Sequence, residues 1–304
     1  MAISKHYCVA SPYKGETLYS WLARISFLSG FPSDETFLQY FIGAKNHHLN
    51  SIFPSYFPEL QVFSKIEARY LIDNHTALPY YRPFSVERLY QQAISELMSQ
   101  KNNLGYSQFS LIGKPKPKEG QLFYCACCAV KDIESEGVAY WHIEHQLPWV
   151  EACFIHQCIL SNVLALPNQL ILPPQKVIKG EAVKAHPSQI QFALLSKSLW
   201  EFNLPALDII RILKVYLSGF ASKGLCNKGN SLNQSDLVEA VKEYWNGYID
   251  SKLFALILNT NSLVHFPSCL LYDPKAQKSP VNHLIVIGML FGTLDNFIWH
   301  YHRS

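Results

Sequence analysis

A cluster of cysteines and histidines in the middle of the chain is the feature that most constrains its fold. Residues 123–130 are FYCACCAV, and residues 152–158 are ACFIHQC. A tetrahedral zinc site needs four nitrogen or sulfur ligands, and short turns of the form Cys-x-x-Cys or Cys-x-x-His supply two each. The spacing therefore predicts one Zn²⁺ held by four ligands: Cys125, Cys128, Cys153 and His156.

Other candidate ligands close to this cluster fit the spacing less well. Cys127 and Cys128 are adjacent, so their side chains diverge, and Cys158 would have to reach back across the turn. His142 and His145 in YWHIEHQLP compete as ligands, but packed histidines explain them more simply. A closed site with four protein ligands leaves no position for water, so we expect the zinc to be structural.

The composition favours a metal-binding protein of a reducing compartment. Five of the eight cysteines lie between residues 125 and 158, which is unlike a disulfide framework. The first residues lack the apolar core of a signal peptide, and the longest apolar run, at 284–294, is too short to span a bilayer. We therefore expect a cytoplasmic protein that does not enter the membrane. A net charge of +3 does not by itself indicate a nucleic-acid binder.

Apolar periodicity predicts a mainly α fold in three parts. Residues 1–113 form a helical, helix-turn-helix-like region, residues 114–170 a small Cys3His zinc-binding domain, and residues 171–304 a C-terminal helical domain. The break is placed at GKPKPKEG (113–120), because alternating prolines cannot continue a helix. In the first part we expect a helix over 16–29, with its apolar face made by four residues and its end at Gly30. The four residues are Leu18, Leu22, Ile25 and Leu28.

Further helices are expected on both sides of the cysteine cluster. Ser33 can cap a second helix that begins with Asp34 and Glu35. In the last part, Pro205 is expected to begin a helix that ends at Gly219, and a buried helix is expected over about 281–299. A helix pair of this kind could be a helix-turn-helix, although two helices packed in a core have the same pattern.

Basic residues that could contact DNA form two groups. Near the second helix pair we single out Lys214, Lys223 and Lys228, and in the proline-rich linker Lys114, Lys116 and Lys118. For the linker lysines, a solvated surface is the commoner explanation.

Three kinds of enzyme are weighed against the pattern and none fits. HIEHQ is not His-Glu-x-x-His, so the helix-borne ligand pair of a metalloprotease is missing. In a zinc deaminase the His-x-Glu motif precedes the Cys-x-x-Cys turn, whereas here the order is reversed. Nothing marks one thiol as an activated nucleophile. We therefore expect a protein that is not an enzyme.

Taken together, the motifs resemble the TniQ family of transposon target-selection proteins. SPYKGETLYSWLARISFLSG (11–30) is similar to the start of the family, and residues 123–160 are similar to its zinc segment. The apolar helix near the end of the chain is also similar. The resemblance implies the same four zinc ligands, Cys125, Cys128, Cys153 and His156, and places Cys127 at a variable position. Gln157 stands where glycine is common in the family.

The resemblance implies a bacterial, non-enzymatic adaptor. Such a protein marks an insertion site, through attachment-site DNA or through an RNA-guided Cascade-type complex, and recruits a TnsC-like AAA+ ATPase regulator. A homodimer remains open. The helix around Tyr19, Trp21 and Arg24 is the candidate recruiting surface, with core packing of Trp21 as the alternative. A zinc-stabilised helix-turn-helix regulator with no role in transposition is the second hypothesis.

Overall fold

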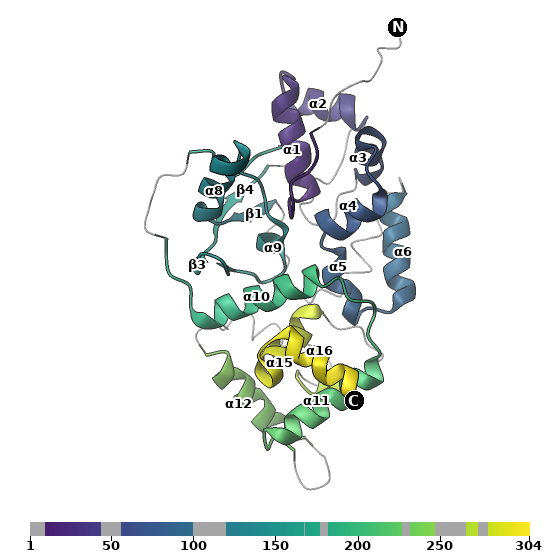
Figure 1. Ribbon diagram of the computed structural model, residues 1–304, viewed down its shortest axis with the longest axis vertical. Coiled ribbons are helices and arrows are strands. Elements are labelled where there is room, and N and C mark those ends of the chain that lie inside the picture. Colours follow the sequence, from purple (N-terminus) through teal and green to yellow (C-terminus); the bar gives the residue numbers. More distant parts are fainter. Residues whose placement is uncertain are drawn as a thin grey trace.

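The computed structural model describes most of the chain and is mainly helical, as predicted. The described residues are 10–43, 56–99, 120–166, 168–176, 182–226, 232–246, 266–272 and 279–304. Helices dominate within these ranges, and the strands among them are short. Figure 1 shows the N-terminal helices at one end of the molecule, the metal-cluster segment beside them, and the C-terminal helices at the other end.

The segment before the cysteine cluster folds into short helices that sequence signals begin and end. Thr17 accepts a hydrogen bond from the Ser20 amide at the start of α1, and Gly30 ends that helix with a φ of 68°. Ser33 caps α2 in the same way, as predicted. The elements are α1 (Leu18–Ser29), α2 (Asp34–Phe41), α3 (Phe57–Ser64), α4 (Ala68–His75), α5 (Leu78–Tyr81), the 3-10 turn η1 (Arg82–Phe84) and α6 (Glu87–Met98).

The first helix is buried on all sides over most of its length. All residues from 15 to 26 are buried, polar ones included. The predicted apolar face is confirmed for Leu18, Leu22 and Ile25 but is wrong for Leu28, which is 65% exposed. The reason is that the end of α1 extends beyond the core, so that Phe27 and Leu28 face solvent.

The metal-cluster segment combines two small antiparallel sheets with two helices. Its elements are β1 (Gln121–Tyr124), α8 (Ala126–Glu136), α9 (Ile143–Gln146), β2 (Ala152–Cys153), β3 (Cys158–Ile159) and β4 (Ser161–Leu164). Strand β1 pairs with β4, and β2 pairs with β3 in a register that sets Cys153 opposite Cys158. Because β1 precedes Cys125 and β4 follows the β2–β3 turn, this pairing brings the two halves of the cysteine cluster close together in space.

The C-terminal helices gather below a long helix that crosses the middle of the molecule (Figure 1). This helix, α10 (Pro187–Glu201), contacts α5 and α9 on one side and α15 on the other. It is followed by α11 (Ile209–Ser222), α12 (Gln234–Tyr244), α14 (Cys269–Tyr272), α15 (Pro280–Phe291) and α16 (Leu294–Arg303). Helix α10 thereby joins the two ends of the fold.

Two predicted helix boundaries in this part are wrong. The helix expected from Pro205 to Gly219 begins at Ile209 and continues to Ser222, because Asp208 is the residue that caps it. The single helix expected over about 281–299 is two helices, since Gly292 ends α15 with a φ of 75° and Thr293 caps α16. Its burial is confirmed for α15, whose residues are buried from Val281 to Met289 apart from a half-buried Asn282.

A continuous apolar core runs through the described residues. Buried side chains from all three predicted parts belong to one hydrophobic cluster, including Trp21, Trp141 and Trp245. The predicted domain boundaries at 113 and 170 stay predictions. No single described helix is long and apolar enough to cross a membrane; α15 and α16 reach that length only as a pair, and they are bent by 84°.

The close contact between α15 and α12 gives a stability prediction. A Cβ added at Gly288 would lie 2.8 Å from Cη2 of Trp245 and closer still to Cζ2. The indole is held in place by its hydrogen bond to the Ile285 carbonyl, 3.0 Å away. We expect Gly288→Ala to lower the free energy of unfolding by about 1–3 kcal/mol in urea titrations, although Gly→Ala inside a helix is normally stabilising.

A matched variant separates crowding from helix propensity. A Cβ at Gly219 would meet Cδ1 of Leu290 at 2.9 Å, and this methyl group lies at the end of a flexible side chain. Gly219→Ala should therefore destabilise less than Gly288→Ala. Equal stability of the Gly288→Ala variant and the wild type would contradict the packing described here.

Candidate metal centre

The first pair of ligands lies where a strand passes into a helix. Strand β1 ends at Tyr124, and Cys125 follows in extended conformation as the N-cap of α8. Its carbonyl accepts the first helical hydrogen bond, from the Ala129 amide at 3.0 Å. Cys128 lies one turn into the helix, so both thiols face the same side of the junction.

The second pair lies on the turn between β2 and β3. Cys153 ends β2, and its sulfur accepts a hydrogen bond from the His156 amide at 3.4 Å. Gln157 completes the turn with a φ of 52°, in the left-handed region that favours glycine. This conformation explains physically why glycine would suit the position. The turn directs the His156 imidazole toward the thiols of the first pair.

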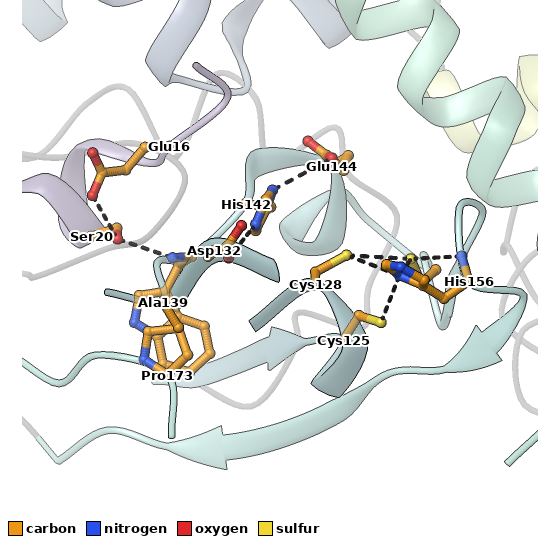
Figure 2. A network of polar contacts seen from close by, with 12 residues as sticks. Glu16, Ser20, Cys125, Cys128, Asp132, Ala139, His142, Glu144, His156 and Pro173 are labelled. Atoms are coloured by element: carbon orange, nitrogen blue, oxygen red, sulfur yellow. Dashed lines mark hydrogen bonds and ion pairs between the residues drawn. The ribbon is translucent and has the colours of Figure 1, made fainter. Parts of the chain in front are cut away.

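The four predicted ligand atoms meet at one point. The distances from His156 Nδ1 to the sulfurs of Cys125, Cys128 and Cys153 are 3.4, 3.3 and 3.6 Å, and the Cys128 and Cys153 sulfurs are 3.7 Å apart. All four ligand atoms lie within 4.8 Å of one another. Tetrahedral zinc with usual bond lengths would separate two sulfurs by about 3.8 Å and sulfur from nitrogen by about 3.6 Å. The residues present therefore fit a metal ion, and Figure 2 shows Cys125, Cys128 and His156 pointing toward one another.

The thiols perturb one another because they are packed closely together. Hydrogen bonds from Cys128 and Cys153 hold the pKa of Cys125 well below its ordinary value. The hydrogen bond to Cys125 in turn raises the pKa of Cys128 far above its ordinary value. Cys127 lies outside the ligand group and is only half-buried. A cation at the centre would neutralise the charge that the thiolates carry.

The competing histidines lie outside the ligand group. His142 Nε2 is 2.9 Å from Asp132 Oδ2, its Nδ1 is 3.7 Å from Glu144 Oε1, and its ring stacks on Tyr140 at 4.3 Å. His145 is buried, and neither of its ring nitrogens has a hydrogen-bond partner among the described residues. In Figure 2, His142 and its two carboxylates lie apart from the thiols. His142 therefore serves as an ion-pair partner inside the fold.

The predicted recruiting surface, Tyr19, Trp21 and Arg24, is buried. The Tyr19 hydroxyl donates to the Gln169 carbonyl at 2.8 Å, and the Trp21 indole donates to the Ala10 carbonyl at 2.6 Å. Arg24 is 3% exposed and forms an ion pair with Glu16 at 2.8 Å. All three side chains make contacts within the chain, so the structure supports core packing for them. Their contact with a partner stays a prediction, and direct contact would require the fold to open.

Glu16 is the centre of a buried polar network. Its carboxylate is completely buried and accepts hydrogen bonds from Arg24 Nε and Nη2, from Ser20 Oγ at 3.0 Å and from the Tyr13 amide at 2.9 Å. Its backbone carbonyl is 2.8 Å from His75 Nδ1 on α4. The Arg24 guanidinium also lies over the Tyr13 ring, 4.0 Å from its centroid. Several segments therefore meet at one carboxylate.

The same network joins α1 to the metal-cluster segment. The Trp141 amide donates to Ser20 Oγ at 3.0 Å, and the Thr17 amide donates to the Trp141 carbonyl at 3.0 Å. The Ile143 amide donates to the Gly15 carbonyl at 2.8 Å. Figure 2 shows Glu16 and Ser20 on one side of this junction and the metal ligands on the other. The start of α1 is thus fixed to the segment that carries the ligands.

The predicted DNA-contacting lysines are only partly within the described chain. Lys214 and Lys223 lie on or next to α11 and are exposed. Four others lie outside the described residues: Lys114, Lys116, Lys118 and Lys228. DNA contact by any of them stays a prediction.

Sequence reasoning missed two exposed arginines and the close approach of Cys158 to Cys125. Arg211 lies on α11 with its guanidinium 5.3 Å from the Tyr301 ring centroid, and Arg303 lies 3.8 Å from the ring centroid of Trp299. Their spacing along the sequence gave no signal, because α11 and α16 are brought together only by the fold. Cys158 lies outside the group of four ligands, as predicted, but its sulfur is 3.5 Å from that of Cys125.

Comparison with known proteins identifies the family. The sequence profile of TniQ matches residues 8–160, which is half of the chain. This chain belongs to the TniQ family. The match includes α1, the Glu16 network and all four ligands of the candidate metal centre.

A transposition protein is similar to about half of this chain. The transposon Tn7 transposition protein TnsD of Escherichia coli is 24% identical over 153 residues. The alignment covers 49% of this chain and 30% of that protein, so this chain spans less than two thirds of the length of the relative. The TniQ match ends at residue 160, so α10 to α16 lie beyond it.

The His142 ion pairs predict a loss of stability at alkaline pH. Burial alone would lower the pKa of His142, but hydrogen bonds to Asp132 and Glu144 outweigh it and raise the pKa to about 9. Because the folded pKa exceeds the unfolded value of 6.5, this contribution is complete below about pH 6.5 and is lost between pH 6.5 and 9. The shift corresponds to about 3 kcal/mol. Urea unfolding of the wild type should show this loss, and His142→Gln should show much less of it.

Two neighbouring groups have a lowered pKa in the folded chain, so their contribution to stability is lost as the pH falls. Burial is the main cause that lowers the pKa of His145, to about 4, so protonation of the unfolded chain removes stability as the pH falls from 6.5 to 4. Burial would raise the pKa of Glu144, but its hydrogen bond with His142 lowers it to about 2, and this contribution is lost below about pH 4.5.

For the alkaline prediction on His142, the variant His302→Gln is the control for loss of an imidazole, because His302 is exposed. The ion-pair account fails if His142→Gln and the wild type lose the same free energy from pH 6.5 to 9.

Proposed function

We propose that this chain is a non-enzymatic target-selection adaptor in transposition, which connects a target to a TnsC-like AAA+ ATPase regulator. The observation that carries the proposal is the TniQ match over residues 8–160, which contains both the α1 motif and the ligand cluster. The similarity to TnsD supports the same conclusion. The target is attachment-site DNA or an RNA-guided Cascade-type complex.

We also propose that the metal is one structural Zn²⁺. Three thiolates and one imidazole at tetrahedral spacing are the ligand set and geometry that zinc favours. Four protein ligands close the coordination shell, so the ion holds the β1–α8 junction and the β2–β3 turn together. Metal binding in such a site contributes directly to folding free energy.

Removal of the metal should affect the chain unevenly. A chelator in excess should increase amide hydrogen exchange first and most strongly in residues 120–164, because the ion joins both halves of this segment. Helix α15 is the internal control, since it lies in the core far along the chain and carries no ligand. A uniform increase along the chain, or none, would contradict a structural metal at this site.

Binding to DNA is proposed to use the exposed lysines on α11 and at its C-terminal end. Lys214 and Lys223 are exposed, and the helix itself contains no acidic residue. Phosphate contacts release counterions, so the affinity should fall as salt increases, with a slope of about 0.9 in log K per contact. The double variant Lys214→Ala/Lys223→Ala should therefore bind an attachment-site duplex more weakly, with a salt slope smaller by up to about 2.

Binding to duplex DNA and association with the ATPase regulator, measured on the same proteins, test the adaptor proposal. Lys131→Ala, which removes an exposed lysine of α8, is the control and should bind duplex like the wild type. Association with the ATPase regulator is measured by pull-down with and without DNA. Absence of that association in both conditions would overturn the adaptor proposal. Duplex binding without ATPase association would favour the helix-turn-helix regulator, and ATPase association without duplex binding would assign target choice to an RNA-guided complex.

A further inference from the structure

A fifth sulfur lies against the candidate metal centre. Cys158 is 3% exposed, and its sulfur is 3.5 Å from that of Cys125. The β2–β3 register fixes its position, because Cys158 is paired directly with Cys153. Its backbone is also held on the outer side by an isolated bridge to Lys184. This thiol is therefore fixed beside the ligands and shielded from solvent.

The sulfur of Cys158 lies against one ligand of the site, Cys125. Two sulfurs that bind the same zinc are about 3.8 Å apart. The separation between Cys125 and Cys158 is shorter than this, so Cys158 sits in contact with the coordination shell. With the four ligands bound, its S–H donates to the Cys125 thiolate. Binding to the ion would require the sulfur to move from its place beside Cys125 toward the centre of the site, because Cys158 is not among the four residues whose ligand atoms all lie within 4.8 Å of one another.

His156 is the ligand that is held least firmly. It is half-buried, whereas the three cysteine ligands are buried. Its Nε2 has no hydrogen-bond partner among the described residues. Metal-bound histidines usually donate this second N–H to a carboxylate, a carbonyl or water, which fixes the ring and strengthens the ligand. Among the described residues, no protein group therefore fixes the ring of His156 through a hydrogen bond to its second nitrogen.

We propose that Cys158 is a reserve metal ligand that replaces His156, so that the site can bind its metal with either three thiolates and one imidazole or four thiolates. This inference rests on the metal site proposed above and extends its ligand set. In the exchange, the metal–nitrogen bond to His156 breaks and a metal–sulfur bond to Cys158 forms. The proton of the Cys158 thiol passes to the released imidazole or to water. No electrons are transferred, and the set of metal ligands gains one negative charge.

The test compares metal affinity in four forms of the full chain. These are the wild type, His156→Ala, Cys158→Ala and the double variant His156→Ala/Cys158→Ala. Zinc content and affinity are measured by competition with a chelator, and Co²⁺ replaces zinc as a spectroscopic probe of the ligands. We expect one metal per chain in both single variants. The double variant should lose affinity at least about a hundredfold, because loss of a direct ligand exceeds the usual effect of an outer partner.

The Co²⁺ spectrum distinguishes thiolate from water at the fourth position. His156→Ala should show stronger sulfur-to-cobalt charge transfer and ligand-field bands at longer wavelength than the wild type, as expected for four thiolates. Cys158→Ala should retain the wild-type spectrum. His156→Ala/Cys127→Ala is the matched control, because Cys127 is a neighbouring thiol outside the ligand group, and it should behave like His156→Ala.

Several outcomes would overturn the inference. One is loss of metal in His156→Ala as complete as in the double variant; another is a cobalt spectrum that is the same in both. A wild type without metal would overturn the metal site itself. Circular dichroism of each variant shows whether the helices remain, so that global unfolding is recognised. Duplex and ATPase binding are not used as measurements, and failure of the adaptor proposal would leave these results unaffected.

Discussion

One carboxylate that is completely removed from water organises the region around the candidate metal centre. Glu16 is paired with Arg24, and it also accepts hydrogen bonds from Ser20 and Tyr13. Loss of one partner from a buried ion pair leaves an uncompensated charge and typically costs about 3–5 kcal/mol. Because these partners come from the start of the chain and from α1, the pair fixes the path of both. The metal-cluster segment is then attached through Ser20 and Trp141.

The ligand cluster and the Glu16 network therefore depend on each other. The segment between α8 and β2 carries Trp141 and His142 and lies between the two ligand pairs along the chain. Its Trp141 packs in the core beside α1, and its His142 is paired with Asp132 of α8. A short and well-packed segment therefore connects the ligands to the Glu16 network, while α11 is remote from it along the chain.

The features that could be predicted from the sequence are those set by local spacing. Cys125 with Cys128, and Cys153 with His156, are separated by single turns, and Thr17, Gly30 and Ser33 act on their own helix ends. The features that could not be predicted depend on residues far apart in the chain. Tyr19 and Arg24 are buried because other segments cover them, and Cys158 approaches Cys125 because of the β2–β3 pairing.

The inward orientation of the GETLYSWLAR motif changes what this motif means when it is found in another sequence. Every residue from Gly15 to Arg24 is buried in this structure, and the polar ones are engaged inside the fold. Such a segment contributes to assembly of the fold and presents almost no surface to a partner. A matching sequence should accordingly be expected to share this architecture, and its specificity should be sought among residues that vary on the outer faces.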